Sequence, residues 1–417
     1  MRRFDAIVSY RTDNHKRHFL IVRDCPVKMV TVLPRFARVL PDFILLVAAL
    51  LCQLFAARLL LRRTTRSGAR ALIYAAVGVL SALLLLGFAL RSDRVAANFP
   101  GQWAVWERGL SILWVLLCLG WMAGFVVSSL ASRLAGPAHH PGRRQFLAAA
   151  RAVMFAAPPA VLGYGVFIQR NQFAMREQNV AIPGLPASLE GLRIVQLTDI
   201  HLSPFLSRAD LARAVAMANE TRAQIALVTG DLITTRRDPL DDCLRELSNL
   251  RADAGIFGCM GNHELYAGGQ DHAEQEGARL GLRFLRGTAA ALRFGDATLN
   301  LAGVDYQEVR KTYLVGAEKT IVPGATNILL SHNPDVFLTA ARMGYALTLS
   351  GHTHGGQVRV EILGEDVNVA RFFTRYVDGL YRSGPSSIFV SRGLGTIGVP
   401  ARLGAPPEVA LLRLVRA

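Results

Sequence analysis

Residues 193–201 read RIVQLTDIH, and this stretch decides the fold. An apolar run of about six residues ends in Asp199 and His201, whose side chains can both ligate a metal. A short apolar run of this composition predicts a buried β-strand. Four later runs repeat the pattern: 224–229 before Gly230-Asp231, 255–260 before Gly261-Asn262-His263-Glu264, 327–331 before His332, and 345–350 before Gly351-His352-Thr353-His354.

Helical segments lie between the first of these predicted strands. Ser207 and Asp210 have the spacing of a capping box at the start of one helix. Asp238 and Pro239 predict the N-cap and the first residue of the next helix. Alternating strands and helices indicate an α/β fold, in which ligands bind beyond the carboxyl ends of the strands.

Histidines gather at the same strand ends. Residues 171–417 contain six of them, and five lie in the clusters: His201, His263, His332, His352 and His354. A single histidine is usually a satisfied core residue, but five beside Gly, Asp or Asn indicate a shared metal site. With Asp199, Asp231 and Asn262 they form a set without a thiolate, which suits Mn, Fe or Zn better than Mg or Ca.

This set contains more ligands than one metal uses, because one catalytic metal typically takes three protein ligands. Two divalent metal ions with one bridging carboxylate would use them all. The reaction class that needs such a pair is phosphoester hydrolysis, in which a hydroxide attacks while charge on the phosphoryl oxygen is neutralised.

In chain order, DIH, GD, GNHE, a lone His and GHTH resemble the signature of the calcineurin-like metallophosphoesterase superfamily. With the apolar N-terminal half, the layout resembles the membrane-anchored bacterial branch. The resemblance implies an α/β fold, a four-layer αββα sandwich of two mixed sheets flanked by helices, preceded by an all-α transmembrane region. It also implies hydrolysis of a phosphomonoester or phosphodiester by a metal-bridging hydroxide at a dinuclear site.

The resemblance also implies a role for each matched residue. In this assignment one metal is held by Asp199, His201 and His354, and the other by Asn262, His332 and His352. Asp231 bridges both metals. The catalytic residue His263 protonates the leaving oxygen or stabilises charge in the transition state. One position departs from the pattern, because Thr234 stands where many relatives carry an acid, and this leaves open what orients His263. Arg392 and Arg402 could clamp a phosphate or form structural ion pairs.

Four apolar stretches in the N-terminal half predict membrane spans: 43–61, 71–90, 109–132 and 152–168. The net charge of +16 lies entirely in residues 1–170, because residues 171–417 hold 25 basic and 25 acidic side chains. Basic residues that flank apolar spans are topology signals, so we expect a membrane protein with no nucleic-acid partner.

Basic loops set the expected orientation. Loops 62–70 and 133–145 predict the cytoplasmic side, and loop 91–108 the outer side, which places the hydrolytic domain outside the cytoplasm at the inner (cytoplasmic) membrane. The nine basic residues of segment 1–38 contradict this scheme, and we hypothesise that translation starts at Met29. Arg143-Arg144 either resembles a twin-arginine export signal or anchors the fourth span, and both readings place the domain outside.

We expect the following division: a basic segment at 1–38, of which the part before Met29 is not translated if Met29 is the start, a membrane region at 39–170, a linker at 171–188 and the metallophosphoesterase domain at 189–417. The partners we expect are the membrane and a phosphoester, with no protein partner. Alternatives are a hydrolase of phospholipids or lipid-linked pyrophosphates of envelope metabolism, and a non-catalytic scaffold, which the complete ligand set disfavours. Five cysteines without a CxxC pair indicate no disulfide framework.

Overall fold

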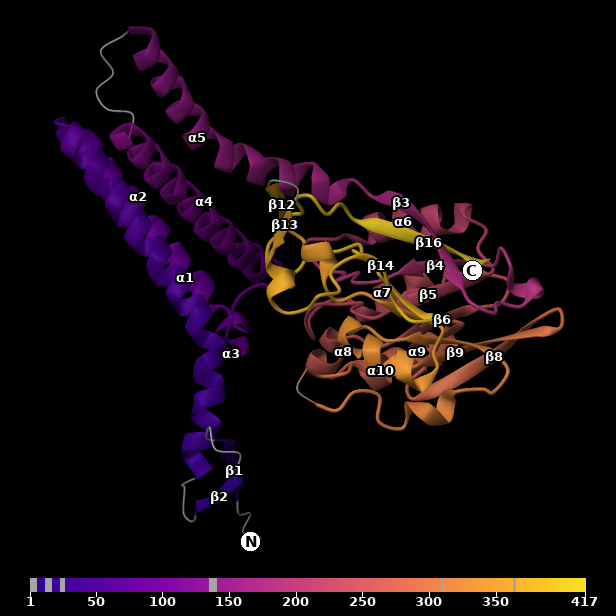
Figure 1. The fold of residues 1–417 in the computed structure, drawn as a ribbon. Helices are drawn as coiled ribbons and strands as arrows, with labels where there is room; N and C mark the ends of the chain where they lie inside the picture. The colour runs from indigo at the N-terminus through magenta and orange to yellow at the C-terminus, as the bar shows by residue number, and fades with distance from the viewer. Residues whose placement is uncertain (1–5, 12–16, 23–26, 135–140, 310, 363–364) are drawn as a thin grey trace. The chain divides into compact units, whose positions relative to one another are not determined.

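The computed structural model describes the chain except for residues 1–5, 12–16, 23–26, 135–140, 310 and 363–364 (Figure 1). The described residues form two compact units, Met1–Phe88 and Ala89–Ala417. Parts of the predicted N-terminal segment and of loop 133–145 therefore lie outside the described residues.

The first unit contains an antiparallel hairpin and two long helices. Strands β1 (Ala6–Arg11) and β2 (Arg17–Val22) pair with each other. Helices α1 (Val27–Arg63) and α2 (Ser67–Ala89) follow and carry the first two apolar stretches.

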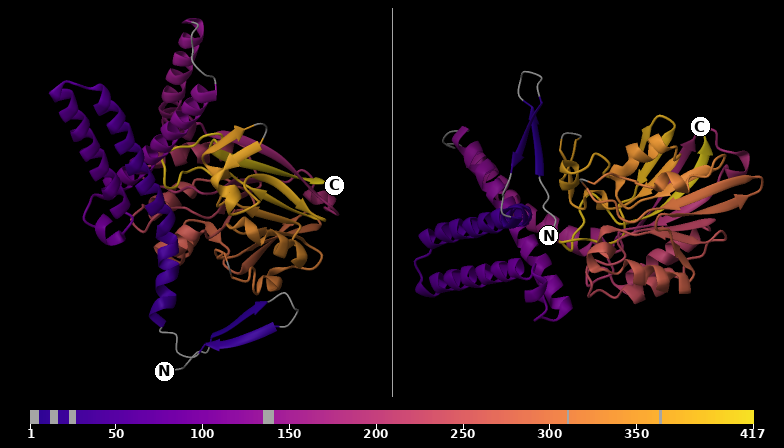
Figure 2. Two further views of the ribbon diagram at one scale, coloured as in Figure 1. Left: turned by 60° about the vertical axis from the view of Figure 1, so that its left-hand side comes forward. Right: turned by 90° about the horizontal axis from the view of Figure 1, so that it is seen from below.

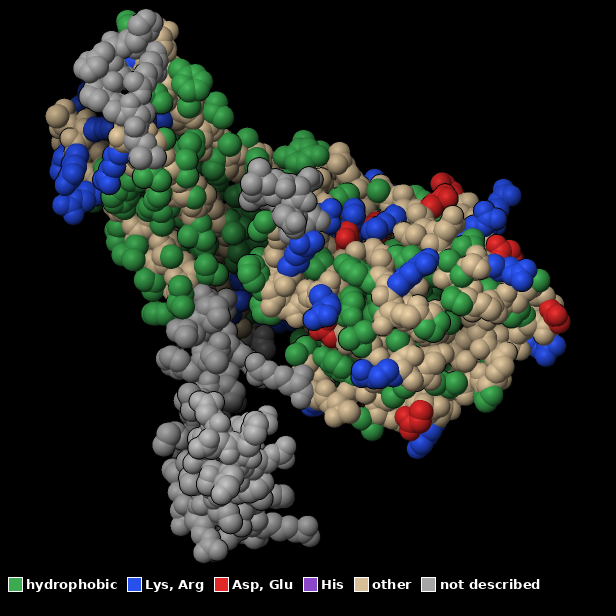
Figure 3. All heavy atoms as spheres, viewed as in Figure 1, with side chains coloured by type: hydrophobic (Ala, Val, Ile, Leu, Met, Phe, Trp, Pro, Cys, Tyr) green, Lys and Arg blue, Asp and Glu red, His purple; other side chains and the backbone are tan. Residues whose placement is uncertain are grey.

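The second unit begins with three further helices: α3 (Asp93–Ala96), α4 (Gly101–Leu134) and α5 (Pro141–Phe167). Four helical segments of the described chain are long and apolar enough to cross a membrane: Phe43–Arg63, Ser67–Ala89, Gly101–Arg133 and Arg144–Asn171. Helix α5 stays helical through Pro158 and Pro159. Hydrophobic side chains cover most of the visible surface of the long helices in Figure 3. The prediction of four apolar helices is confirmed.

Two six-stranded mixed sheets build the rest of this unit (Figure 1). The first has the order β3 (Ala174–Ile182), β16 (Glu408–Arg416), β4 (Arg193–Leu197), β5 (Ile225–Thr229), β6 (Ile256–Cys259) and β7 (Leu282–Phe284). The second has the order β14 (Gly379–Ser383), β15 (Ser386–Val390), β11 (Leu347–Ser350), β10 (Thr326–Leu330), β9 (Ala297–Gly303) and β8 (Thr288–Phe294). A separate hairpin, β12 (Arg359–Ile362) with β13 (Glu365–Asn368), follows β11 in the chain.

The two sheets pack face to face, and helices cover their outer faces (Figure 2). One buried cluster joins Ile194 and Leu227 of the first sheet to Leu301 and Leu330 of the second. Helices α6 (Arg208–Glu220) and α7 (Leu240–Leu247) pack on the outer face of the first sheet through a second buried cluster. Helices α8 (Asn262–Ala267) and α9 (Gln270–Arg279) follow them in the chain. Helix α10 (Phe337–Met343) covers the second sheet. This is the predicted αββα sandwich.

Two local expectations were wrong. The segment 171–188, predicted as a linker, contains β3, which pairs in parallel with β16 along its whole length. Helix α7 begins after Pro239, which is its N-cap and contributes no side-chain cap. The Asp238 carboxylate instead accepts hydrogen bonds from the backbone amides of Thr234 and Thr235.

Candidate metal centre

The predicted site residues follow strands that lie side by side. Strands β4, β5 and β6 are mutually parallel neighbours in the first sheet, and β10 and β11 are parallel neighbours in the second. Their carboxyl ends therefore lie at one edge of each sheet, as the α/β pattern predicts. The side chains of Asp199, His201, Asp231, His332 and His354 are almost completely buried there.

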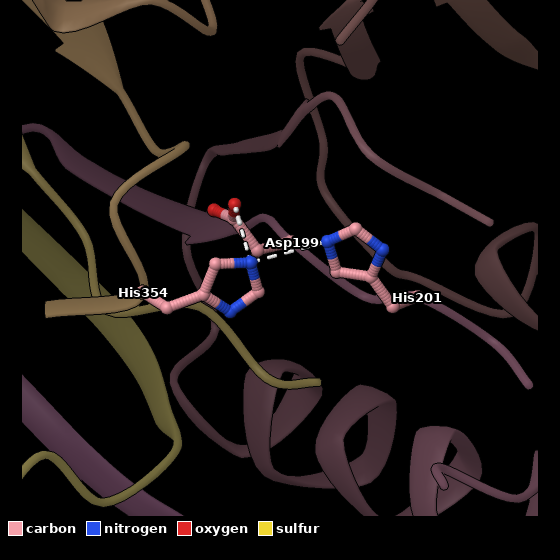
Figure 4. Close-up of side chains that lie close together, drawn as sticks. All are labelled: Asp199, His201 and His354. Atoms are coloured by element: carbon pink, nitrogen blue, oxygen red, sulfur yellow. Dashed lines mark hydrogen bonds and ion pairs between the residues drawn. The ribbon is translucent and has the colours of Figure 1, made fainter. Parts of the chain in front are cut away.

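One group of these side chains consists of Asp199, His201 and His354 (Figure 4). The Nε2 atoms of His201 and His354 lie 3.1 Å apart, and Nε2 of His354 lies 3.4 Å from Oδ1 of Asp199. All three ligand atoms lie within 4.8 Å of one another, so one cation could contact all of them.

A second group consists of Asp231, His332 and His352. Oδ2 of Asp231 lies 3.0 Å from Nε2 of His332 and 3.5 Å from Nε2 of His201, which belongs to the first group. The Asp231 carboxylate therefore lies between the two groups, where a bridging ligand would have to be. His263 forms a third group with His201 and Asp231.

One buried polar atom at this centre, Oδ1 of Asn262, has no hydrogen-bond partner among the described residues. An unsatisfied buried polar atom is costly, and natural structures keep one where a ligand or an ion uses it. Together with the oxygen and imidazole donors around it, this atom fits a divalent cation.

The backbone at the centre is strained. Eight non-glycine residues of the described chain have a positive φ, and five of them are predicted ligands: Asp199, His201, Asp231, His352 and His354. Such conformations cost about 1–3 kcal/mol each and are concentrated at functional sites. The surrounding fold therefore imposes these positions on the ligand side chains.

Hydrogen bonds outside the centre orient the imidazole rings. Nδ1 of His332 donates to the carbonyl oxygen of Thr229 over 2.8 Å, and Nδ1 of His201 lies 3.0 Å from Oγ1 of Thr234. Each bond leaves Nε2 facing the ligand groups. Metal-binding histidines are commonly fixed through their second ring nitrogen in this way.

The electrostatics of the centre favour a positive charge between the carboxylates. Burial lowers the pKa of His201 to about 3 and that of His352 to about 4, so both rings are neutral at pH 7 and can ligate a metal. Burial acts on His332 in the same direction, but the Asp231 carboxylate overrides it and raises the pKa of His332 to about 10. Desolvation also raises the pKa of Asp199 to about 6.

The calcineurin-like phosphoesterase family matches residues 192–356 of the chain. A transmembrane protein with a metallophosphoesterase domain from Bos taurus is 30% identical over 313 residues, which cover 71% of this chain and 67% of that protein. The chain belongs to this family. The metallophosphoesterase YkuE of Bacillus subtilis is 28% identical over 65% of this chain and 97% of its own length. The phosphodiesterase YaeI of Escherichia coli is 28% identical over 66% of this chain and 99% of its own length.

These comparisons confirm two predictions. The chain is a calcineurin-like metallophosphoesterase, and it is a hydrolase of phosphoester bonds. Its relatives include bacterial proteins and also eukaryotic transmembrane forms. The family binds divalent metals, and the structure places candidate ligand groups together. The role of each residue stays a prediction.

In this metallophosphoesterase Thr234, the residue that departs from the family pattern, contacts two site histidines. Its carbonyl oxygen accepts a hydrogen bond from Nδ1 of His263 over 2.7 Å, while its hydroxyl contacts His201. A backbone carbonyl therefore orients His263, which requires no acidic side chain at position 234. The sequence could not indicate this contact, because any residue carries such a carbonyl.

Glu264 is a site residue whose importance the sequence did not indicate. Its side chain is fully buried, and its carboxylate accepts hydrogen bonds from the backbone amides of Asp231, Leu232 and Gly261 over 2.7–2.9 Å. These bonds join the strand-end loops that carry Asp231 and Asn262. Glu264 is therefore a positioning residue for the metallophosphoesterase site.

The structure favours structural roles for the two arginines whose function was left open. Arg402 is fully buried and donates to the backbone carbonyls of Gly395, Ala405 and Arg392, and burial lowers its pKa to about 10. Its Nη2 also lies 3.4 Å from Nδ1 of His354, so it orients a predicted ligand. Arg392 forms an ion pair with Asp378 over 2.5 Å.

Tyr306 is a further neighbour of the site, in the loop after β9. Its ring centroid lies 5.6 Å from that of His352 and 6.2 Å from that of His332. Burial raises the pKa of its hydroxyl, which therefore remains protonated at neutral pH and can act as a hydrogen-bond donor. The position of Tyr306 after a strand is a weak signal that sequence analysis did not use.

Proposed function

We propose that this metallophosphoesterase hydrolyses a phosphomonoester or phosphodiester with two divalent cations, of which Mn, Fe or Zn suit the donors best. The observation that carries the proposal is the position of the Asp231 carboxylate, within 3.5 Å of an imidazole nitrogen of each ligand group. The unsatisfied Oδ1 atom of Asn262 supports it.

In the proposed assignment, one cation is held by Asp199, His201 and His354, the other by Asn262, His332 and His352, and Asp231 contacts both. Bound divalent cations lower the pKa of water and stabilise negative charge on a phosphoryl oxygen. The strained backbone and the outer hydrogen bonds hold the ligand side chains before the substrate arrives, which avoids reorganisation during the reaction.

His263 is the proposed proton donor to the leaving oxygen. Because the carbonyl of Thr234 accepts the hydrogen on Nδ1 over 2.7 Å, a second proton can reside only on Nε2. The backbone amide of His263 also donates to Oδ1 of Asp231 over 2.9 Å, which fixes the residue beside the proposed bridging ligand. A positioned acid of this kind typically contributes about 10²–10⁴-fold to the rate.

Turnover of the purified full-length chain in detergent tests this function. The metal-stripped protein is loaded with Mn²⁺, Fe²⁺ or Zn²⁺, and hydrolysis of bis-p-nitrophenyl phosphate and p-nitrophenyl phosphate is followed beside metal content. We expect metal-dependent turnover that Asp231→Asn abolishes, and the ratio of the two rates reports diester or monoester preference. A protein that binds no metal would contradict the site assignment.

The membrane placement is a further part of this proposal. Four membrane-compatible helices and transmembrane relatives indicate a membrane protein. We propose the inner (cytoplasmic) membrane, with a membrane region at 39–170 and the hydrolytic domain at 189–417 outside the cytoplasm. Protease digestion of intact spheroplasts tests this topology, because an outside domain is cleaved without lysis and an inside domain is protected.

The non-catalytic alternative is disfavoured by the complete ligand set. A scaffold that had lost catalysis would not need an unsatisfied amide oxygen at Asn262 or five strained residues at one centre.

A further inference from the structure

A cleft lies beside the candidate metal centre, within the unit Ala89–Ala417. One wall is formed by residues between 96 and 108, around the start of α4. The other is formed by segments 202–208 and 234–239 of the hydrolase domain and by residues 265–268 at the end of α8. Its volume is about 1420 Å³. Pockets for drug-sized ligands are smaller, about 300–1,000 Å³, so this cleft has room for a large ligand.

Direct contacts hold the two walls together. The guanidinium of Arg237 donates to the carbonyl oxygen of Ala96 over 2.9 Å. The ring of Trp106 packs edge-on against Phe205 with 5.0 Å between centroids. The backbone of Gly109 approaches Pro400 so closely that a Cβ there would lie 2.9 Å from the proline ring. The cleft is therefore a built feature of this unit.

The cleft adjoins the His263 side of the metal centre. Thr234 and Tyr266 line it. The carbonyl of Thr234 accepts the hydrogen bond from His263, and the ring of Tyr266 lies 5.8 Å from the His263 ring. A leaving group protonated by His263 would therefore occupy this side, with the rest of the substrate in the cleft.

The charge of the lining favours an anion. It contains the four arginines Arg108, Arg208, Arg236 and Arg237, against the two aspartates Asp238 and Asp242. Both aspartates already have partners in the protein, because Asp238 accepts backbone amides and Asp242 pairs with Arg245 over 2.6 Å. The planar guanidinium of arginine matches the oxygens of a phosphate, with two parallel hydrogen bonds.

Arginines line both walls of the cleft. Arg108 lies at the start of α4 on one wall, and Arg208, Arg236 and Arg237 lie on the other. Arg236 is exposed and Arg108 is half-buried. A phosphate in the cleft could therefore be contacted by an arginine from each wall.

The cleft also lies beside the start of a candidate membrane span. Its wall at residues 96–108 immediately precedes the uncharged stretch 109–132 of α4. Trp103 in this wall region is exposed and stacks on Phe99 at 5.0 Å, and the guanidinium of Arg170 lies over the Trp106 ring at 5.7 Å. Tryptophan and arginine at the end of an apolar span mark the headgroup layer of a bilayer.

We propose that this cleft binds the anionic headgroup of a membrane phospholipid and that this lipid is the phosphoester substrate of the adjoining centre. The second half of the proposal rests on the function proposed above. In the reaction one water is consumed, the ester P–O bond breaks, the water oxygen remains on phosphorus, and the leaving oxygen takes a proton from Nε2 of His263. Arg108 and Arg236 hold the headgroup, and the acyl chains remain in the membrane.

Direct binding tests the cleft independently of turnover. The metal-stripped full-length protein in detergent is titrated with dihexanoylphosphatidic acid and with glycerol 3-phosphate, which carries the same phosphomonoester without acyl chains. We expect the lipid to bind at least about tenfold more tightly, because burial of its chains adds affinity. Arg108→Ala and Arg236→Ala should each raise its Kd by about fivefold to tenfold, as loss of a charge-assisted hydrogen bond does.

Arg293→Ala is the matched control, because Arg293 is an exposed arginine on the edge strand β8 and does not line the cleft. This variant should bind the lipid as the wild type does. In the metal-loaded protein, the ratio of phosphatidic acid turnover to bis-p-nitrophenyl phosphate turnover should fall in the two cleft variants and stay constant in the control.

Equal Kd values in wild type and both cleft variants would overturn the headgroup assignment, as would equal binding of glycerol 3-phosphate and the lipid. Turnover of bis-p-nitrophenyl phosphate without arginine-dependent lipid binding would overturn this inference and leave the proposed function intact. Arginine-dependent lipid binding by a protein that hydrolyses no phosphoester would overturn the substrate half, together with the proposed function.

Discussion

Substitution of Gly261 by alanine should displace the Asp231 carboxylate and disable the centre. The backbone of Gly261 has φ −95° and ψ −176°, which alanine adopts without strain, so the effect is steric alone. A Cβ at this position would lie 2.5 Å from the backbone nitrogen of Asp231 and 2.8 Å from its Cγ. Carbon atoms in contact lie about 3.5–4.0 Å apart, so the carboxylate has to move by about 1 Å.

A displacement of that size has two measurable consequences. Misplacement of a catalytic group by about 1 Å costs about 100-fold in rate, and overpacking costs about 1–3 kcal/mol of stability. We expect Gly261→Ala to lose at least about 100-fold of its turnover of bis-p-nitrophenyl phosphate and to bind less metal per chain by elemental analysis.

Two further variants make this test specific. Gly351→Ala should act in the same way on the other carboxylate, because its Cβ would collide with Asp199 and lie 2.9 Å from Cγ2 of Thr198. Gly78→Ala is the control, since nothing lies within 4 Å of a Cβ there. Turnover and metal content of Gly261→Ala within about threefold of wild type would refute the steric reasoning.

Three other predictions concern His263, Glu264 and the two buried cysteines of the hydrolase domain. His263→Asn should lower kcat by about 10²–10⁴-fold and leave the metal content unchanged; loss of metal would instead identify His263 as a ligand. Glu264→Gln should lower the free energy of unfolding by about 2–3 kcal/mol in urea denaturation, because one amide oxygen cannot replace two charged acceptors for three backbone amides; an unchanged midpoint would show that these bonds are replaceable. Cys243 and Cys259 should resist iodoacetamide at pH 8 until the protein unfolds, because burial raises their thiol pKa; labelling of the native protein, read by mass spectrometry, would contradict their burial.

The strands that carry the predicted ligands could be read from the sequence because each is a short apolar run. Strands β4, β5, β6, β10 and β11 all begin and end within two residues of the predicted runs. The polar residues after them needed no tertiary information, because parallel neighbours bring their carboxyl ends together. Local patterns therefore predicted the layout of the candidate centre.

Features that depend on tertiary contacts were missed. The orientation of His263 depends on a backbone carbonyl at Thr234, which leaves no trace in the sequence. The carboxylate of Glu264 is important only because three amides from separate loops meet it. Asp238 was predicted as a helix cap because nothing local shows that the amides of Thr234 and Thr235 compete for it.

The position of β16 in its sheet governs when the protein can finish folding. This strand comprises residues 408–416, yet it lies between β3 and β4, which precede it by more than 200 residues in the chain. Proteins emerge from the ribosome N-terminus first, and the apolar helices precede the hydrolase domain in the chain. The first sheet therefore keeps an open edge at β4 until residues 408–416 have been synthesised, and an unpaired edge can pair with other chains. Ribosome stalling or truncation before residue 408 should thus yield a membrane-inserted chain in which the first sheet of the hydrolase domain stays incomplete.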